Sequence, residues 1–207
     1  MRGAETAVTS DEERRATILQ AAAQVFATKG FSGATTAEIA KLARVSKRDL
    51  YDHFESKEGL LAAMVRSYST SLPIAADLGT PDTADAFFDS LRTFGRRFAA
   101  DLYQPHRTSL FRLAASEAGR VNELGKAIYE AGAGPVAASV RAFVGKAIAA
   151  GVLKPQDAGL AMSAFFGILL GDRQVWQIVG AIDVPTDEEI ATSADLAVEA
   201  VRRIIAP

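Results

Sequence analysis

The sequence contains no cysteine, which excludes disulfide bonds and any metal site with a thiolate ligand. Histidine is scarce as well, since His53 and His106 are the two copies. No carboxylate or second histidine stands at ligand spacing from His106, and no serine lies in a nucleophile elbow. Gly132 and Gly134 follow no strand, so they do not form a phosphate loop. We therefore expect no enzyme, no cofactor and no metal site.

Long apolar runs are also missing. The longest uncharged apolar stretch is 158–171, which is shorter than the roughly 20 residues that a membrane-spanning helix needs. Residues 1–10 hold no apolar segment of the kind found in secretion signals. The sequence therefore predicts a cytoplasmic protein without a membrane partner.

An excess of basic charge is absent too. The chain has 23 Lys and Arg against 25 Asp and Glu, for a formal net charge of −2. Overall basicity is the usual electrostatic sign of a nucleic-acid partner, so the total charge argues against one. The distribution is more informative, because Lys41, Arg44, Lys47 and Arg48 stand close together in an N-terminal region that is neutral overall. Any attraction to phosphates must come from this local patch.

What is present is a helical pattern along nearly the whole chain. Ile18, Ala22 and Val25 show the three- and four-residue spacing of a helix face, and no window alternates like a strand. We therefore expect an all-α protein with an N-terminal domain of residues 1–56, a connecting helix from about 57, and a C-terminal domain of residues 57–207. The expected helices are about 11–29, 36–43, 47–54, one from 57, 83–103, 106–118, 121–131, 135–150, 156–179 and 186–205.

Two of the short helices meet at a tight corner, residues 44–46. Ala40 is small enough to let the helices cross closely, and Leu50 faces back toward the first helix. This is the pattern of a helix-turn-helix, whose second helix enters the major groove of DNA. The alternative interpretation is a solvated helix pair that happens to carry basic residues.

Residues from about 12 to 64 resemble the DNA-binding domain of the tetracycline-repressor (TetR) family of transcriptional regulators. The matching segments are ILQAA (18–22), FATKGF (26–31), TTAEIAKLA (35–43), VSK (45–47), LYDHF (50–54) and SKEGLL (56–61). Residues 110–180 are similar to the AefR-like regulatory domain of that family, through LFRL (110–113), SEA (116–118), YEAG (129–132) and FGILLGD (166–172).

The resemblance implies a homodimer that binds a palindromic operator in double-stranded DNA. It implies a regulator, most often a repressor, that a small apolar or aromatic effector releases from DNA. In such proteins Tyr51 and Lys57 hold phosphates, and residues 47–49 read bases. The candidate DNA-contacting residues are Thr35, Thr36, Arg44, Lys47, Arg48, Asp49, Tyr51, His53 and Lys57.

The sequence departs from the family pattern at the corner and in the second helix. Arg44 stands where a glycine is usual, so either it takes a left-handed backbone at a cost of about 1 kcal/mol or the corner differs. Arg48 and Asp49 replace a common Gly-Thr pair. Arg48 is expected to read guanine, contact phosphate or face solvent, and Asp49 to accept from a cytosine amine or to orient its basic neighbours. These departures keep an alternative open, a helical dimeric interaction protein that has lost operator binding.

The C-terminal domain is rich in aromatic residues that serve either as core or as the lining of a ligand cavity. The candidate lining residues are Phe94, Phe98, Phe111, Glu117, Tyr129, Phe166, Leu170 and Arg173. Small residues at helical spacing in the last helices predict a dimer interface, and packing within one chain is the alternative. The candidate interface residues are Ala161, Ala164, Phe165, Gly167, Ile168, Ala194, Ala197 and Val201.

Overall fold

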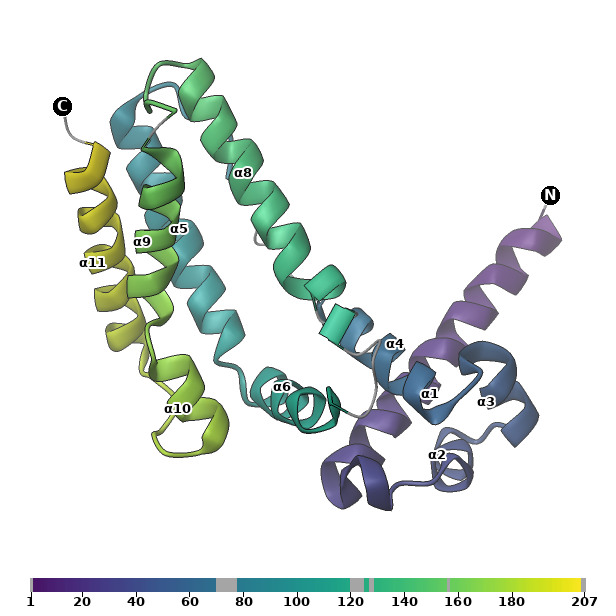
Figure 1. Ribbon diagram of the computed structural model, residues 1–207. Coiled ribbons are helices and arrows are strands. Elements are labelled where there is room, and N and C mark those ends of the chain that lie inside the picture. The colour runs from purple at the N-terminus through teal and green to yellow at the C-terminus, as the bar shows by residue number, and fades with distance from the viewer. Residues whose placement is uncertain (1, 70–77, 120–124, 127–128, 156, 206–207) are drawn as a thin grey trace. The chain divides into compact units, whose positions relative to one another are not determined.

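The computed structural model describes residues 2–69, 78–119, 125–126, 129–155 and 157–205. Every regular element in these ranges is a helix, which confirms the all-α prediction (Figure 1). The elements are α1 (Arg2–Gly33), α2 (Thr36–Ala43), α3 (Lys47–Phe54), α4 (Lys57–Ser69), α5 (Ala84–Leu102), α6 (Pro105–Glu117), the π-helix η2 (Tyr129–Ala133), α8 (Gly134–Ala149), α9 (Ala158–Leu170), α10 (Arg173–Val179) and α11 (Asp187–Ile205).

The chain folds into two compact units. Unit 1 comprises Met1–Thr70 with Leu113–Ala131, and unit 2 comprises Ser71–Arg112 with Gly132–Pro207. The division falls within helix α6, whose residues up to Arg112 belong to unit 2 and whose residues from Leu113 belong to unit 1.

The helix-turn-helix lies in unit 1. Helix α1 packs against α2 and α4, and α3 packs against both α2 and α4. Ile18, Ile39 and Leu50 are fully buried where these helices meet. Each of the three lies at a helical spacing that faces its neighbours, so the short helices are stabilised by a shared apolar core.

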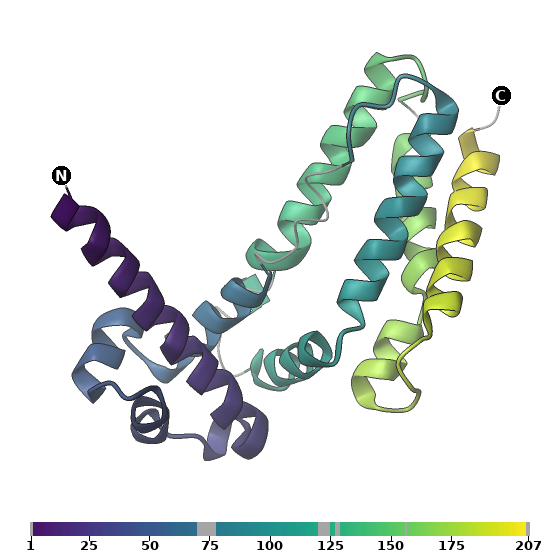
Figure 2. The same cartoon turned by 180° about the vertical axis from the view of Figure 1, so that it is seen from behind.

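Unit 2 is a helical bundle in which α11 packs against α9 and α5 (Figures 1 and 2). Phe143 of α8 stacks on Phe87 of α5 with ring centroids 5.0 Å apart, which joins α8 to the bundle. Gly95 permits the close approach of the other helices to α5. A β-carbon at that position would lie 3.0 Å from the Phe165 ring and 3.5 Å from the Ala194 methyl group.

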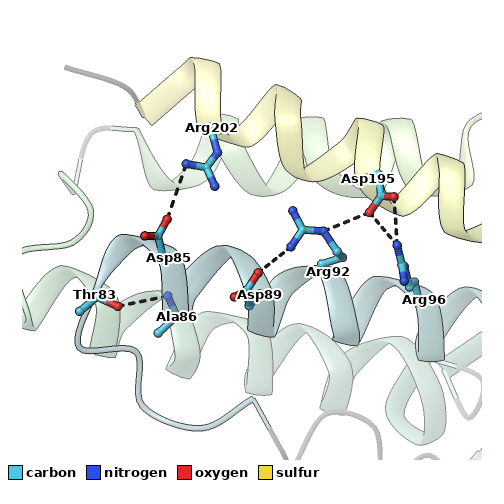
Figure 3. A network of polar contacts seen from close by, with 8 residues as sticks. All are labelled: Thr83, Asp85, Ala86, Asp89, Arg92, Arg96, Asp195 and Arg202. Carbon is cyan, nitrogen blue, oxygen red and sulfur yellow. Dashed lines mark hydrogen bonds and ion pairs between the residues drawn. The ribbon is translucent and has the colours of Figure 1, made fainter.

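A polar seam runs along the α5–α11 contact (Figure 3). The carboxylate of Asp195 accepts hydrogen bonds from Arg92 Nε and Arg96 Nη2, each at 3.0 Å. Arg202 lies 3.8 Å from Asp85 and places its guanidinium 4.1 Å from the centroid of the Phe88 ring. Two cations converge on one carboxylate, so the seam fixes the register of α11 along α5.

The predicted helix boundaries are wrong in two places. The first helix begins at Arg2 and not near residue 11, although Gly30 (φ 68°, ψ 174°) interrupts it close to its predicted end. The segment predicted as one helix over 156–179 is two helices, because Gly171 takes a φ of 53° that a helix cannot continue through. The helix predicted over 121–131 lies mostly outside the described residues.

Candidate nucleic-acid interface and aromatic core

The corner between α2 and α3 has the left-handed backbone of a helix-turn-helix. Arg44 takes φ 55° and ψ 39°, and its N–H donates to the carbonyls of Ala40 and Lys41. The sequence left open whether Arg44 takes a left-handed backbone or the corner differs, and the structure shows the left-handed backbone. An L-residue pays about 1 kcal/mol there relative to glycine. The corner is thus preserved without the glycine that usually makes it.

The start of α2 is fixed by the predicted capping box. Thr35 Oγ1 accepts from the Glu38 N–H, and the Glu38 carboxylate accepts from the Thr35 N–H at 3.2 Å. The ammonium of Lys29 pairs with the same carboxylate, and these partners, Lys29 first and Thr35 second, hold the pKa of Glu38 below its ordinary value. Thr35 therefore caps the N-terminus of α2, in addition to any contact with DNA.

Asp49 closes the first turn of α3. Its carboxylate accepts from the Ser46 N–H at 3.1 Å, and its own N–H donates to Ser46 Oγ at 3.0 Å. Hydrogen bonding of Ser46 to the carboxylate, through its side chain first and its backbone N–H second, lowers the pKa of Asp49. This capping role was missed at the sequence level, although the Ser-x-x-Asp spacing was there to find it. Asp49 therefore stabilises the N-terminus of α3.

The N-terminal turn of α3 presents two cations. Lys47 is exposed, and the side chain of Arg48 is 90% exposed, with its Nε 3.9 Å from the Asp52 carboxylate. Leu42, two residues before Arg44, is 46% exposed. The first turn of α3 therefore carries long, unburied side chains of the kind that reach base edges.

Thr36 and Tyr51 lie together across the motif. Their hydroxyl oxygens are 3.0 Å apart, which links the first residue of α2 to the middle of α3. Tyr51 is 43% exposed. The pair offers two neighbouring hydroxyls at the surface, a suitable arrangement for one phosphate oxygen.

Two other candidates are engaged within the fold. Lys57 Nζ donates to the carbonyls of Phe31 and Ala34, at 2.8 and 3.1 Å, and lies 4.4 Å from the centroid of the Phe31 ring. His53 has a side chain only 16% exposed, and its Nε2 lies 3.6 Å from a carboxylate oxygen of Asp11. A phosphate contact by Lys57 would use its one remaining N–H, because two are already donated.

The junction between α3 and α4 is unusually tight. Glu55 takes φ 56° and ψ −44°, and the Ser56 N–H donates to the Phe54 carbonyl across it, which makes a γ-turn. A β-carbon on Gly59 would lie 2.4 Å from the same carbonyl oxygen. Glycine at residue 59 is therefore needed for α4 to start this close to the end of α3.

In unit 2 the structure brings together three of the predicted lining residues. Phe94 stacks on Phe98 at 5.5 Å between ring centroids, and Phe166 meets both rings edge-on, at 6.2 and 5.8 Å. Phe165 completes this aromatic cluster at 5.3 Å from Phe166. Phe94 and Phe165 are buried, whereas Phe98, Phe166 and Leu170 are half-buried and pack against the core.

The structure does not place the remaining lining candidates in this cluster. Phe111 and Tyr129 are exposed, by 39% and 57%. Glu117 is buried and belongs to unit 1. Arg173 pairs with Glu189 at 3.0 Å. Tyr103, which the sequence did not single out, is buried at the end of α5 with a hydroxyl that accepts from and donates to no described residue.

Five of the predicted interface residues lie in the core of a single chain and offer no surface to a partner. They are fully buried, because α9 and α11 pack against each other within unit 2. These residues are Ala161, Phe165, Ala194, Ala197 and Val201. The small-residue spacing thus coincides with a close contact between α9 and α11 within one chain, and a dimer interface formed by these helices stays a prediction. Ala164, Gly167 and Ile168 keep some exposure on α9.

Across the described ranges, no group of three or more His, Asp or Glu side chains is arranged to hold a metal ion. In the same ranges, none of the helices combines the length and the apolar character that crossing a membrane requires.

Comparison with protein families agrees with this geometry. The description "AefR-like transcriptional repressor, C-terminal domain" matches residues 89–204, which is more than half of the chain. The description "Bacterial regulatory proteins, tetR family" matches residues 18–64. The chain belongs to the TetR family. It is a transcriptional regulator of that family, and both resemblances predicted from the sequence are confirmed.

Solved structures resemble this TetR-family chain along most of its length. One is a chain described as a TetR-family transcriptional regulator from Mesorhizobium loti MAFF303099, with 29% identity, coverage of 94% of this chain and 97% of that one, and a TM-score of 0.81. Another is the flavonoid-responsive regulator FrrA, with 28% identity, coverage of 95% and 98%, and a TM-score of 0.77.

The curated relatives match over a shorter segment. The transcriptional activator FasR of Mycolicibacterium smegmatis is 43% identical over 61 residues, which make up 30% of this chain and 28% of FasR. Across the curated relatives the matched segment spans 20% to 29% of their length.

Proposed function

We propose that this TetR-family chain is a homodimeric repressor that binds a palindromic operator and is released from it by a small aromatic effector. The observation that carries the proposal is the first turn of α3. There Lys47 and Arg48 are exposed on a helix that Ser46 and Asp49 cap and that the Arg44 corner orients.

The exposed groups suit the chemistry of a DNA duplex. An arginine at the start of a recognition helix can donate two hydrogen bonds to guanine in the major groove. The paired hydroxyls of Thr36 and Tyr51 can donate to a phosphate, which positions the helix without reading sequence. The departures from the family pattern at Arg44 and Asp49 left a second interpretation, a helical protein that has lost operator binding. Arg44 forms the corner and Asp49 caps α3, so neither residue supports that interpretation.

The outward faces of α9 and α11 support the dimer. Leu160 and Ile168 of α9 are 64% and 41% exposed and stand two helical turns apart on one side, with Ala164 between them. Leu196 of α11 is 58% exposed. A second copy packed on this face would bury these side chains in a four-helix interface.

The aromatic cluster supports the effector. FrrA is named as flavonoid-responsive, and its likeness to this chain covers the region of the cluster. The half-buried rings of Phe98 and Phe166 are suited to stacking against a planar aromatic molecule.

Operator binding is tested by a mobility shift with the DNA upstream of the protein's own coding sequence. Arg48→Ala and Lys47→Ala are expected to weaken the complex, because each removes an exposed cation from α3. The matched controls are Arg141→Ala and Lys154→Ala, which remove exposed cations from unit 2. Absence of any shift with the wild-type chain at low salt would refute the proposal. Lys57 is unsuitable for this test, because its loss would break contacts within the fold.

The dimer is tested by analytical ultracentrifugation. Ile168→Glu should yield monomers, since it places a charge in the apolar face of α9. Ala138→Glu puts the same charge on an exposed position of α8 and should leave the dimer intact. If both variants sediment as the same species, α9 does not form the dimer interface. A reporter assay in a strain lacking the gene distinguishes repression from activation.

A further inference from the structure

The outward face of α3 contains an acidic residue beside its cations. Within this helix, all of which the structure describes, the exposed residues are Lys47, Arg48, Tyr51 and Asp52. Their spacing of one, three and four residues places them on one side of the helix, away from the buried Leu50. This side is free to enter a major groove, because the other side packs against α2 and α4. A carboxylate here is repelled by the phosphates of any duplex, so Asp52 does not raise affinity by general attraction.

Asp52 differs from Asp49, the residue that the sequence suggested as an acceptor for a cytosine amine. The Asp49 carboxylate accepts from the Ser46 N–H at 3.1 Å and caps the helix. The side chain of Asp52 is 68% exposed, and its Oδ2 lies 3.9 Å from Arg48 Nε, which belongs to a side chain that is 90% exposed. An ion pair between groups as exposed as these adds little to stability. The Asp52 carboxylate is therefore open to a base edge, whereas the Asp49 carboxylate is engaged within the fold.

A carboxylate discriminates between bases because, when ionised, it only accepts hydrogen bonds. In the major groove cytosine presents an amino donor, whereas guanine presents two acceptors and thymine presents an acceptor and a methyl group. Adenine presents a donor next to an acceptor, so it suits a side-chain amide better than a carboxylate. The base edge that fits Asp52 best is therefore that of cytosine.

We propose that Asp52 is a specificity-determining residue, which accepts from a cytosine amine in the operator and disfavours guanine and thymine at that position. This assignment rests on the proposed operator binding and adds a second base pair to the one expected for Arg48. Four residues of helix rise about 6 Å, and successive base pairs of DNA rise about 3.4 Å. With α3 lying along the major groove, Asp52 therefore reads a base pair one or two steps from the one that Arg48 reads.

The test is selection of sites from random DNA by the full-length wild-type protein and its variants, with Arg48→Ala marking the position that Arg48 reads. Asp52→Ala should lose the cytosine preference at a neighbouring position. Asp52→Asn should exchange that cytosine for adenine, because an amide both donates to N7 and accepts from the N6 amine. In binding assays the wild-type protein should prefer the selected cytosine over guanine by about 5- to 150-fold, and Asp52→Ala should show no such preference. Asp183→Asn removes the same charge from an exposed residue of unit 2 and should select wild-type sites.

Two results would overturn the assignment and leave the proposed function standing. In the first, both Asp52 variants select the same sites as the wild-type protein. In the second, Asp52→Ala changes only the position that Arg48→Ala also changes, which would show that Asp52 positions Arg48 and reads no base. A wild-type protein that selects no site refutes operator binding, and the assignment with it. Because Asp52 is exposed, its variants should keep the wild-type thermal midpoint, which separates a lost preference from a loss of folding.

Discussion

The two units reach their structures by different routes. In unit 1, short helices are set by local signals: Thr35 with Glu38 and Ser46 with Asp49 each cap a helix within three residues. In unit 2, residues far apart in sequence decide the packing, as Gly95 does by admitting Phe165 and Ala194. Local spacing is visible in a sequence, whereas the identity of a long-range partner is not.

The two units also differ in the side chains that they offer for binding. The surface of unit 1 presents charged and hydroxyl groups on helices of fixed start and end, which suits a rigid DNA-reading element. The core of unit 2 contains half-buried rings and a buried phenol with no hydrogen-bond partner among the described residues. We therefore expect substitutions in unit 1 to act through local geometry and those in unit 2 through packing.

The largest effect is expected from Phe165→Ala in unit 2. The side chain is fully buried among Phe94, Phe166 and Gly95, so its removal leaves a cavity. The free energy of unfolding, measured with guanidinium chloride, should fall by about 3–5 kcal/mol. Phe111→Ala removes a ring that is 39% exposed and should cost far less. Equal losses would show that the aromatic cluster is not the centre of the core.

A smaller effect is expected from Gly59→Ala in unit 1. The added methyl group lies too close to the Phe54 carbonyl, so the α3–α4 junction must open, at a cost of about 1–3 kcal/mol. Gly145→Ala is the control, because a methyl group there meets open space on α8. Alanine is the better helix former, so this control should gain about 0.5–1 kcal/mol. The same sign for both changes in chemical denaturation would contradict the close junction.

Arg44→Gly tests the corner itself. Glycine takes a φ of 55° without strain, so the variant should gain up to about 1 kcal/mol, less the extra freedom of the unfolded chain. Arg44→Ala keeps a β-carbon in the left-handed region and should show no such gain. A shift of the denaturation midpoint in the same direction for both variants would mean that the arginine side chain, and not backbone strain, decides stability.

The smallest effect is expected from the cap of α3, and it depends on pH. The folded state lowers the pKa of Asp49, so its carboxylate stabilises the fold above its ordinary pKa, and this is lost as pH falls through the lowered value. Asp49→Asn can still accept from the Ser46 N–H but does not titrate. Its thermal midpoint should therefore fall less on acidification than that of the wild-type protein. Identical slopes for both proteins would argue against the capping carboxylate.

The sequence alone predicts unit 1 well. The bounds of α2 and α3 agree with the structure, and the left-handed Arg44 is one of the two outcomes expected for the corner. The contacts of Lys57 and His53 were harder to predict, because their partners are distant in sequence: Phe31 and Asp11 lie on α1, and Ala34 lies in the loop after it. Spacing identifies which residues share a face, but it does not say which neighbour covers that face.

For unit 2 the sequence predicts the helices better than their contacts. The small residues of α9 and α11 mark a close helix approach, yet Ala161 and Ala197 pack within one chain. Nothing in the sequence separates such a seam from a dimer interface, since both need the same small side chains. Tyr103 has no local signal at all, because its unpaired hydroxyl is evident only once the surrounding helices are placed.

The most direct test of operator reading by α3 is selection of preferred sites from random DNA, with wild-type protein and Arg48→Ala in parallel. The exposed Arg48 at the start of the capped helix predicts a guanine at one position of each half-site, and loss of that preference alone in the variant. Arg141→Ala should select the same sites as the wild-type protein. If Arg48→Ala also keeps every preference, Arg48 does not read a base and the proposed recognition surface is wrong.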